Sequence, residues 1–388
     1  MTQRQSTITF ALLVCGTVIG LAGIDLVLPA IPSLPESIAG TLESAQLVLA
    51  SFAAGTAIGL MIFGELGARY KQRYLLIFAL AAYAVLSYAA AQVSSINDLI
   101  IVRFFQGVAS SAPAVFAPGM IKAMYSERGA LKAIGFMGSI ESLTPAFAPV
   151  VGAWLLTLAD WRLSFFVTAA LASLLCVSIF VVGGSSLNHA HARSNAERAS
   201  YGSLFSNKVF MRHALSHACT LGGLLVFVFG APTVITTTMG GSLVDFNIMQ
   251  IIGISLFIVS ANLSDRLVLR FGAERLILFG STMTAFGFLA ILAFAFFGNN
   301  DPRWVWLLFT PINLGLGLRG PPGFYQAVVA AGDNDSRGAA LLILFILGTA
   351  AIGTAVAAPF ITLGLVPLGI VASVIGVSSV LFLQLLKN

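Results

Sequence analysis

Four ionisable residues stand inside long apolar stretches of the chain: Asp25, Arg103, Glu141 and Arg319. A charge at the centre of a membrane helix costs at least about 2.5 kcal/mol on insertion scales, so each needs a partner, water or a function. A carboxyl group can take up and release a proton, and a guanidinium can bind a carboxylate or a phosphate. Proton exchange and anion binding are therefore the chemistry to expect of these side chains.

Arg319 directly precedes an unusual run, Gly320-Pro321-Pro322-Gly323. Two consecutive prolines remove helix hydrogen bonds, so we expect the helix to break or kink there. Backbone groups released in this way are tolerated in a membrane only where they line protein or a cavity. The run predicts that Arg319 offers a fixed positive charge for a carboxylate or phosphate, or alternatively binds backbone carbonyls at the kink.

The composition indicates which elements must position these residues. Of 388 residues, 58% are hydrophobic and 9% are charged, whereas soluble domains carry about 25% charged residues. The 38 glycines agree with closely packed membrane helices. The sequence therefore predicts an all-α membrane protein.

Twelve stretches are apolar and long enough to span a bilayer, which takes about 20 residues. They lie near 8–31, 45–66, 74–93, 98–120, 131–157, 163–184, 213–238, 247–264, 275–298, 304–325, 338–360 and 364–386. Twelve spans place both termini on one side, and among the Lys and Arg residues between spans only Arg162 and Arg303 fall on the other side. Because positive residues concentrate in cytoplasmic loops, we predict cytoplasmic termini.

A polar stretch interrupts the apolar pattern near the middle of the chain. We predict an N-terminal six-helix bundle at 1–184, a cytoplasmic linker at 185–211 and a C-terminal six-helix bundle at 212–388. The basic turn from Arg69 to Arg73 recurs in the second half from Arg266 to Arg275. Such a repeat indicates two pseudo-symmetric bundles around a central pathway.

Five motifs follow one another along the chain: Asp25 to Pro32 (DLVLPAIP), Gly64 to Arg73 (GELGARYKQR), Arg103 to Gly107 (RFFQG), Pro145 to Gly152 and Asn262 to Gly272. Together they resemble the major facilitator superfamily, and in particular its twelve-span drug:proton antiporters of the Bcr/CflA-like branch. The resemblance covers nearly the whole chain. It implies the major facilitator fold and proton-coupled export of small molecules by alternating access between the two halves.

The resemblance also implies roles for single residues. It implicates Arg103 in proton coupling, and it assigns conformational roles in loops and in the fifth span to Gly64, Arg69, Arg73, Pro145, Pro149, Gly152, Asp265 and Arg266. Ala68 departs from the family, which usually has an aspartate there that takes part in a charge latch between the halves.

Asp25 and Arg103 are expected at similar depths. Asp25 lies several residues before the outer end of the first span and Arg103 several residues after the outer start of the fourth, so at 1.5 Å per residue both fall in the outer third. We expect them to face each other across a cavity in the first half and to take part in proton exchange. The alternative is a static salt bridge between two helices.

Glu141 lies near the middle of the fifth span. We expect it to be a second proton carrier or a contact for a cationic substrate. The alternative is a protonated carboxyl that is hydrogen-bonded to a neighbouring helix.

Further candidate substrate contacts, besides Arg319, are Gln106, Asn313, Tyr325 and Phe105. The two arginines favour an anionic or zwitterionic substrate, and the exported molecule could be a drug, a metabolite or a siderophore. An uptake symporter or facilitator for an organic anion is one alternative, and a membrane-embedded sensor is another. We expect a monomer in the bilayer of a bacterial inner membrane.

Other function classes find little support in the sequence. No GxxxxGK[ST] phosphate loop is present, which argues against a primary pump. The sequence shows no nucleophile with a base and no metal-ligand spacing, and Cys15, Cys176 and Cys219 are scattered within apolar runs. We therefore expect no enzyme activity, no cofactor, no metal and no nucleic-acid partner.

Overall fold

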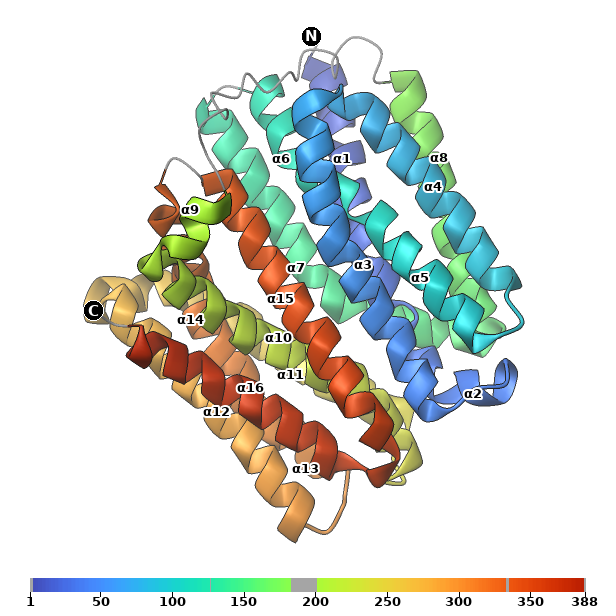
Figure 1. Ribbon diagram of the computed structural model, residues 1–388, viewed down its shortest axis with the longest axis vertical. Coiled ribbons are helices and arrows are strands. Elements are labelled where there is room, and N and C mark those ends of the chain that lie inside the picture. Colours follow the sequence, from blue (N-terminus) through green and yellow to red (C-terminus); the bar gives the residue numbers. More distant parts are fainter. Residues whose placement is uncertain (1–2, 126, 183–200, 333–334, 387–388) are drawn as a thin grey trace. The chain divides into compact units, whose positions relative to one another are not determined.

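The computed structural model describes residues 3–125, 127–182, 201–332 and 335–386. All regular structure in these ranges is helical, and they contain no β-strand. The chain forms two compact units, unit 1 with Met1–Gly40 and Ser51–Glu197, and unit 2 with Thr41–Ala50 and Arg198–Asn388. Figure 1 labels the helices of both units.

Unit 1 holds the helices drawn from blue to green in Figure 1. Their bounds are α1 Gln3–Asp25, η1 Leu28–Ser33, α2 Leu34–Ser37, α3 Leu42–Arg69, α4 Gln72–Gln92, α5 Ile96–Ser110, α6 Ala112–Met124, α7 Glu127–Leu158 and α8 Arg162–Val182, with the first turns of α3 assigned to unit 2. The predicted fourth span thus consists of α5 and α6, with a break at Ser111. Pro113 occupies the first turn of α6, where a missing N–H costs no helix hydrogen bond.

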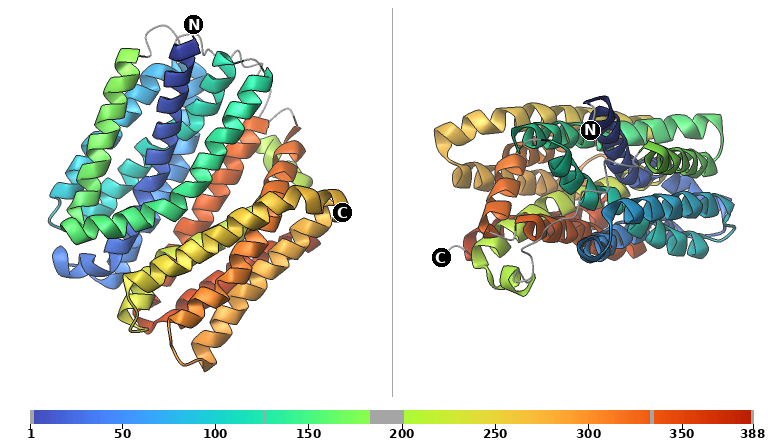
Figure 2. Two further views of the ribbon diagram at one scale, coloured as in Figure 1. Left: turned by 180° about the vertical axis from the view of Figure 1, so that it is seen from behind. Right: turned by 90° about the horizontal axis from the view of Figure 1, so that it is seen from above.

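Unit 2 holds the helices drawn from yellow-green to red, which Figure 2 shows from two further sides. They are α9 Tyr201–Ser206, α10 Lys208–Thr237, α11 Leu243–Phe271, α12 Ala273–Phe297, α13 Arg303–Leu308, α14 Thr310–Ala330, α15 Asp335–Ala357, η4 Ala358–Leu363 and α16 Leu365–Leu385. Of the predicted linker at 185–211, residues 185–200 lie outside the described residues. The remaining part contains α9 and the start of α10.

Ten helices among the described residues are long and apolar enough to cross a membrane, and α7 makes eleven if its two bent segments count as one span. The segments Phe136–Pro145 and Phe147–Leu158 of α7 meet at 45°. Pro145 explains the bend, because it cannot donate to the carbonyl of Glu141 one turn earlier. The remaining predicted span, 304–325, is helical as α13 and α14 but is not among the ten.

Of the break or kink expected at Gly320–Gly323, the break was wrong. Helix α14 continues from Thr310 to Ala330 through Pro321 and Pro322, and the interruption lies earlier, at Phe309. The two prolines still leave the carbonyls of Gly317 and Leu318 without their helix donors. Packing of α14 against α11 and α12 holds the helix together across this weak point.

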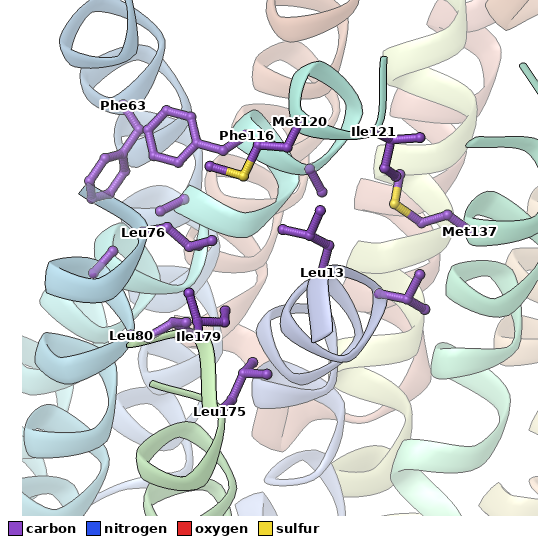
Figure 3. Packing of buried hydrophobic residues seen from close by; sticks show 14 residues of the cluster. Leu13, Phe63, Leu76, Leu80, Phe116, Met120, Ile121, Met137, Leu175 and Ile179 are labelled. Atoms are coloured by element: carbon purple, nitrogen blue, oxygen red, sulfur yellow. The ribbon is translucent and has the colours of Figure 1, made fainter. Parts of the chain in front are cut away.

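Each unit has its own apolar core. In unit 1, Leu13 of α1, Leu76 of α4, Phe116 of α6 and Ile179 of α8 are buried against one another, as Figure 3 shows. The rings of Phe63 and Phe116 meet edge to face at 5.9 Å. In unit 2, a core cluster joins α10, α14 and α15 through residues that include Phe210, Ala214, Ala218, Ala327 and Leu342.

Candidate functional site

Arg103 is the centre of a polar network inside unit 1. Its side chain on α5 is 0% exposed. Nη1 donates to the carbonyl of Gly23 and to Oε1 of Gln106, both at 2.9 Å. Because α1 ends at Asp25, the Gly23 carbonyl belongs to the last turn, whose carbonyls lack helix donors. The guanidinium therefore caps α1, and its charge complements the negative end of the helix dipole.

The network continues from Gln106 to α4. Nε2 of Gln106 donates to Oγ of Ser87 at 2.7 Å, and Ser87 Oγ donates to the carbonyl of Tyr83 at 2.7 Å. The Arg103 guanidinium also lies 4.1 Å from the ring centroid of Phe52 and 5.6 Å from that of Phe165. These cation–π contacts help to compensate for the lost hydration of a buried charge.

Asp25, the last residue of α1, is 6% exposed. The ion pairs found among the described residues do not include one between Asp25 and Arg103, and the guanidinium binds the backbone of α1. The alternative of a static salt bridge between these two residues is therefore not found there, and the facing pair across a cavity stays a prediction. Asp25 is a buried carboxyl at a helix C-terminus, where the helix dipole disfavours its negative charge.

Glu141 lies on α7, one turn before the bend at Pro145, and its partly buried side chain lies beside Thr17 of α1. The Thr17 hydroxyl donates to the carbonyl of Val14 at 2.9 Å. Glu141 thus lies where α7 packs against α1.

The loop motifs form contacts within their own units. Arg69 pairs with Glu65 one turn earlier at 2.6 Å, so a carboxylate on the same helix neutralises it where the family's aspartate is replaced by Ala68. Arg73 is buried and donates through Nη2 to the carbonyl of Phe180 at 2.9 Å. Gly64 lies on α3, directly before Glu65.

The corresponding turn of unit 2 is more open. Asp265 and Arg266 are exposed near the end of α11, and no ion pair among the described residues includes either of them.

The motif of the fifth span brings α7 close to the end of α1. A Cβ atom on Gly152 would lie 2.9 Å from the carbonyl carbon of Leu26 and closer still to its oxygen. Only glycine allows this approach. Pro149 is buried three residues earlier, and Pro145 is exposed at the bend.

Arg319 of α14 is 0% exposed and binds α10. Nη1 donates to the carbonyl of Ser216 at 3.2 Å and to Oγ1 of Thr220 at 3.0 Å, and Nη2 donates to Oγ of Ser216 at 3.3 Å. The guanidinium is thus enclosed between α14 and α10. This agrees better with the predicted binding of backbone carbonyls than with an accessible site for a carboxylate or phosphate.

The other candidate substrate contacts are divided between unit 1, with Phe105 and Gln106, and unit 2, with Asn313 and Tyr325. Asn313 is buried and donates to the carbonyl of Phe309 in its own helix at 3.0 Å. Tyr325 and Phe105 are exposed, and Phe105 meets Phe104 edge to face at 5.4 Å. Of these residues only Gln106 is joined to a candidate proton-coupling residue, Arg103.

The sequence analysis missed a polar cluster in unit 2. Nε2 of His213 lies 3.2 Å from Oε1 of Glu274, and Nη2 of Arg212 lies 2.7 Å from Oε2 of the same carboxylate. His217, one turn further along α10, lies beside Arg319. The signal was the spacing of four between the histidines on an apolar helix. No group of three or more possible metal ligands occurs among the described residues.

Comparisons with known proteins give the family. The sequence pattern of the Major Facilitator Superfamily matches residues 13–354. A bicyclomycin resistance protein homolog from Haemophilus influenzae is 23% identical over 282 residues, which are 71% of each chain. A multidrug resistance protein MdtL from a Shewanella species is 21% identical over 294 residues, 76% of this chain and 73% of that protein. A chloramphenicol resistance protein from Pseudomonas aeruginosa is 31% identical over 144 residues, 37% of this chain and 34% of that one.

A mutant of the nucleoside transporter NupG has a similar fold, with a TM-score of 0.65 and 16% identity, covering 97% of this chain and 98% of that one. The predicted all-α membrane fold and the predicted family are confirmed. This multi-pass membrane protein belongs to the Major Facilitator Superfamily and is a transporter, not an enzyme.

Proposed function

We propose that this transporter exports small organic molecules, drugs among them, in exchange for protons that enter the cell. The proposal places it in a bacterial inner membrane as a monomer with both termini cytoplasmic. Alternating access between the two units would expose the binding site to each side in turn. The names of the relatives, which concern resistance to bicyclomycin, to chloramphenicol and to multiple drugs, support export of drugs.

The observation that carries the proton coupling is the pair of carboxyls near α1. Asp25 is a buried carboxyl whose negative charge has no cationic partner among the described residues. Such a group is stable in its neutral, protonated form and must gain water or a partner before it can ionise. Glu141 contacts α1 through Thr17. Protonation of either carboxyl therefore changes forces on the same helix, which is what a coupling device requires.

The substrate class follows from the charges that the structure leaves accessible. Arg103 and Arg319 are buried and hydrogen-bonded. Neither guanidinium therefore forms an accessible binding site for an anion. Neutral or cationic molecules are thus favoured over the anionic substrate expected from the sequence. Exposed aromatic residues such as Tyr325 and Phe105 are the proposed contacts for an aromatic substrate.

Proton release from the purified protein tests this function. A weakly buffered detergent solution receives chloramphenicol, a lipophilic cation or citrate in turn, and a pH indicator records the protons released. We expect release with chloramphenicol or the cation, and less in Asp25→Asn. Release with citrate alone would instead support transport of organic anions, and no release with any probe would argue for an uncoupled facilitator.

A further inference from the structure

The polar face of α10 is unused by the proposed function. His213, Ser216, His217 and Thr220 recur at the spacing of one helix face, and all four are buried. Ser216 and Thr220 bind Arg319. The two imidazoles each keep a buried Nδ1 atom that has no hydrogen-bond partner among the described residues. A buried polar atom without a hydrogen bond is unfavourable, so its presence in a folded protein needs an explanation.

One end of this face reaches water. His213 touches Glu274 through Nε2, and the Glu274 side chain is 53% exposed. Arg212 holds the carboxylate in place from α10 and donates through Nε to the carbonyl of Leu383 at 2.9 Å. A proton on Nε2 of His213 fits its contact with a carboxylate oxygen. The neutral ring then carries a lone pair on Nδ1 and can accept a proton there.

The other end is enclosed by α14. A Cβ atom on Gly323 would lie 3.0 Å from Nη2 of Arg319 and 3.3 Å from Nδ1 of His217, so the backbone of α14 packs closely against both nitrogens. The ring of Phe324 covers His217 at a centroid distance of 6.1 Å. His217 thus lies next to a fixed positive charge, and it is one helix turn deeper than His213.

We propose that His217 and His213 form a proton path through unit 2 that ends at the exposed carboxylate of Glu274. Residues four apart on a helix have Cβ atoms about 5–6 Å from each other, a gap that one water molecule bridges between the rings. The path rests on the proposed proton coupling and lies within unit 2. Glu274 is then the port through which protons reach the cytoplasm.

Each transfer along the path conserves protons. A proton from His217, carried by the bridging water, forms an N–H bond at Nδ1 of His213. The Nε2–H bond of His213 breaks, and that proton passes to Oε1 of Glu274, which releases it to water. Rotation of the His213 ring then turns its Nδ1–H toward Glu274 and its free Nε2 toward His217, so that the next proton binds at Nε2 while the Nδ1 proton leaves to Glu274.

The charges around the path favour movement of a proton from His217 toward Glu274. The groups that face the two histidines are Arg212 of α10, Glu274 of α12 and Arg319 of α14. Arg319 repels a proton at the buried end, and Glu274 attracts it at the exposed end. This field drives a proton from His217 toward water and opposes its return.

The test separates proton movement from substrate movement in proteoliposomes. The variants are His217→Asn and His213→Asn, which keep polar side chains but cannot carry a proton, and the control replaces His189 and His191 by asparagine. Exchange of labelled against unlabelled chloramphenicol needs no net proton transfer. Uphill chloramphenicol transport driven by a pH gradient, followed with an internal pH dye, does need it.

We expect both variants to lose uphill transport and proton flux by about tenfold or more, with exchange changed by less than about twofold. Glu274→Gln, at the exposed end, should slow proton flux in the same direction. The control should match the unmodified protein. If a histidine variant also loses exchange because it misfolds, the proton flux of Glu274→Gln alone tests the path.

Full proton flux in the histidine variants and in Glu274→Gln would overturn the path while the proposed function stood. Proton flux absent from the unmodified protein with chloramphenicol and also with the lipophilic cation would instead remove the proposed function, and the path with it.

Discussion

Arg103 illustrates how a single buried charge becomes stable. Its guanidinium has a helix C-terminus, an amide oxygen and two aromatic rings as neighbours. A carbonyl at the end of a helix is already a partial negative charge. A sequence shows which carboxylates could pair with Arg103. It does not show where a helix ends, and so it does not show which backbone carbonyls are free to accept from the guanidinium.

Replacing Arg103 by alanine should destabilise unit 1. The change leaves the buried Gln106 amide and the Gly23 carbonyl without their donor, and each unsatisfied group costs about 1–3 kcal/mol. Arg103→Lys keeps the charge but not the planar geometry, so we expect a smaller loss. Intrinsic tryptophan fluorescence during heating measures the midpoint. Equal midpoints for Arg103→Ala and the unmodified protein would contradict the network.

The exposed pair of Arg69 and Glu65 should matter little for stability. Its side chains are 68% and 59% exposed, and such a pair contributes at most about 0.5 kcal/mol. Glu65→Gln should therefore leave the unfolding midpoint nearly unchanged. The same variant should slow transport if Glu65 replaces the family's aspartate in the conformational change. Unchanged transport would show that Glu65 takes no part in that change.

At the scale of elements, the last helix of each unit is capped in a similar way. Arg73 donates to the carbonyl of Phe180 near the end of α8, and Arg212 donates to that of Leu383 near the end of α16. Each arginine joins the end of its unit's last helix to another helix. The sequence repeat predicted matched basic turns, but it could not show that the two caps come from different helices, α4 and α10.

Arg212→Ala should cost more stability than Arg69→Ala. The first change removes a helix cap and a partner of Glu274, whereas the second removes an exposed surface pair. Thermal unfolding of both variants in one detergent gives the comparison. A smaller effect of Arg212→Ala than of Arg69→Ala would show that the contact with α16 contributes nothing.

The close approach of α7 to Leu26 gives a matched pair of glycine variants. Gly152→Ala places a methyl group against the Leu26 carbonyl, and such overpacking costs about 1–3 kcal/mol. Gly138→Ala on the same helix meets nothing within 4 Å and should gain up to about 1 kcal/mol of helix propensity. We expect opposite shifts of the unfolding midpoint, and a stabilised Gly152→Ala would mean that α7 does not contact Leu26 closely.

For the whole molecule, the apolar runs predicted most helices to within a few residues. The run 74–93 became α4 Gln72–Gln92, and 163–184 became α8 Arg162–Val182. The site was harder to predict. The spacing of Asp25 and Arg103 predicts their depth but not the rotation of their helices, and the two histidines of α10 fall in the predicted span 213–238, where the sequence does not show their partners. Depth follows from counting residues, whereas facing partners follow from packing.

Proton-driven transport by Asp25→Asn tests the proposed function most directly. Reconstituted protein is given labelled chloramphenicol, first with a pH gradient and then under equilibrium exchange. Because asparagine cannot exchange a proton, we expect the variant to retain exchange and lose accumulation against a gradient. Accumulation equal to that of the unmodified protein would show that Asp25 carries no coupling proton and would contradict the proposed mechanism.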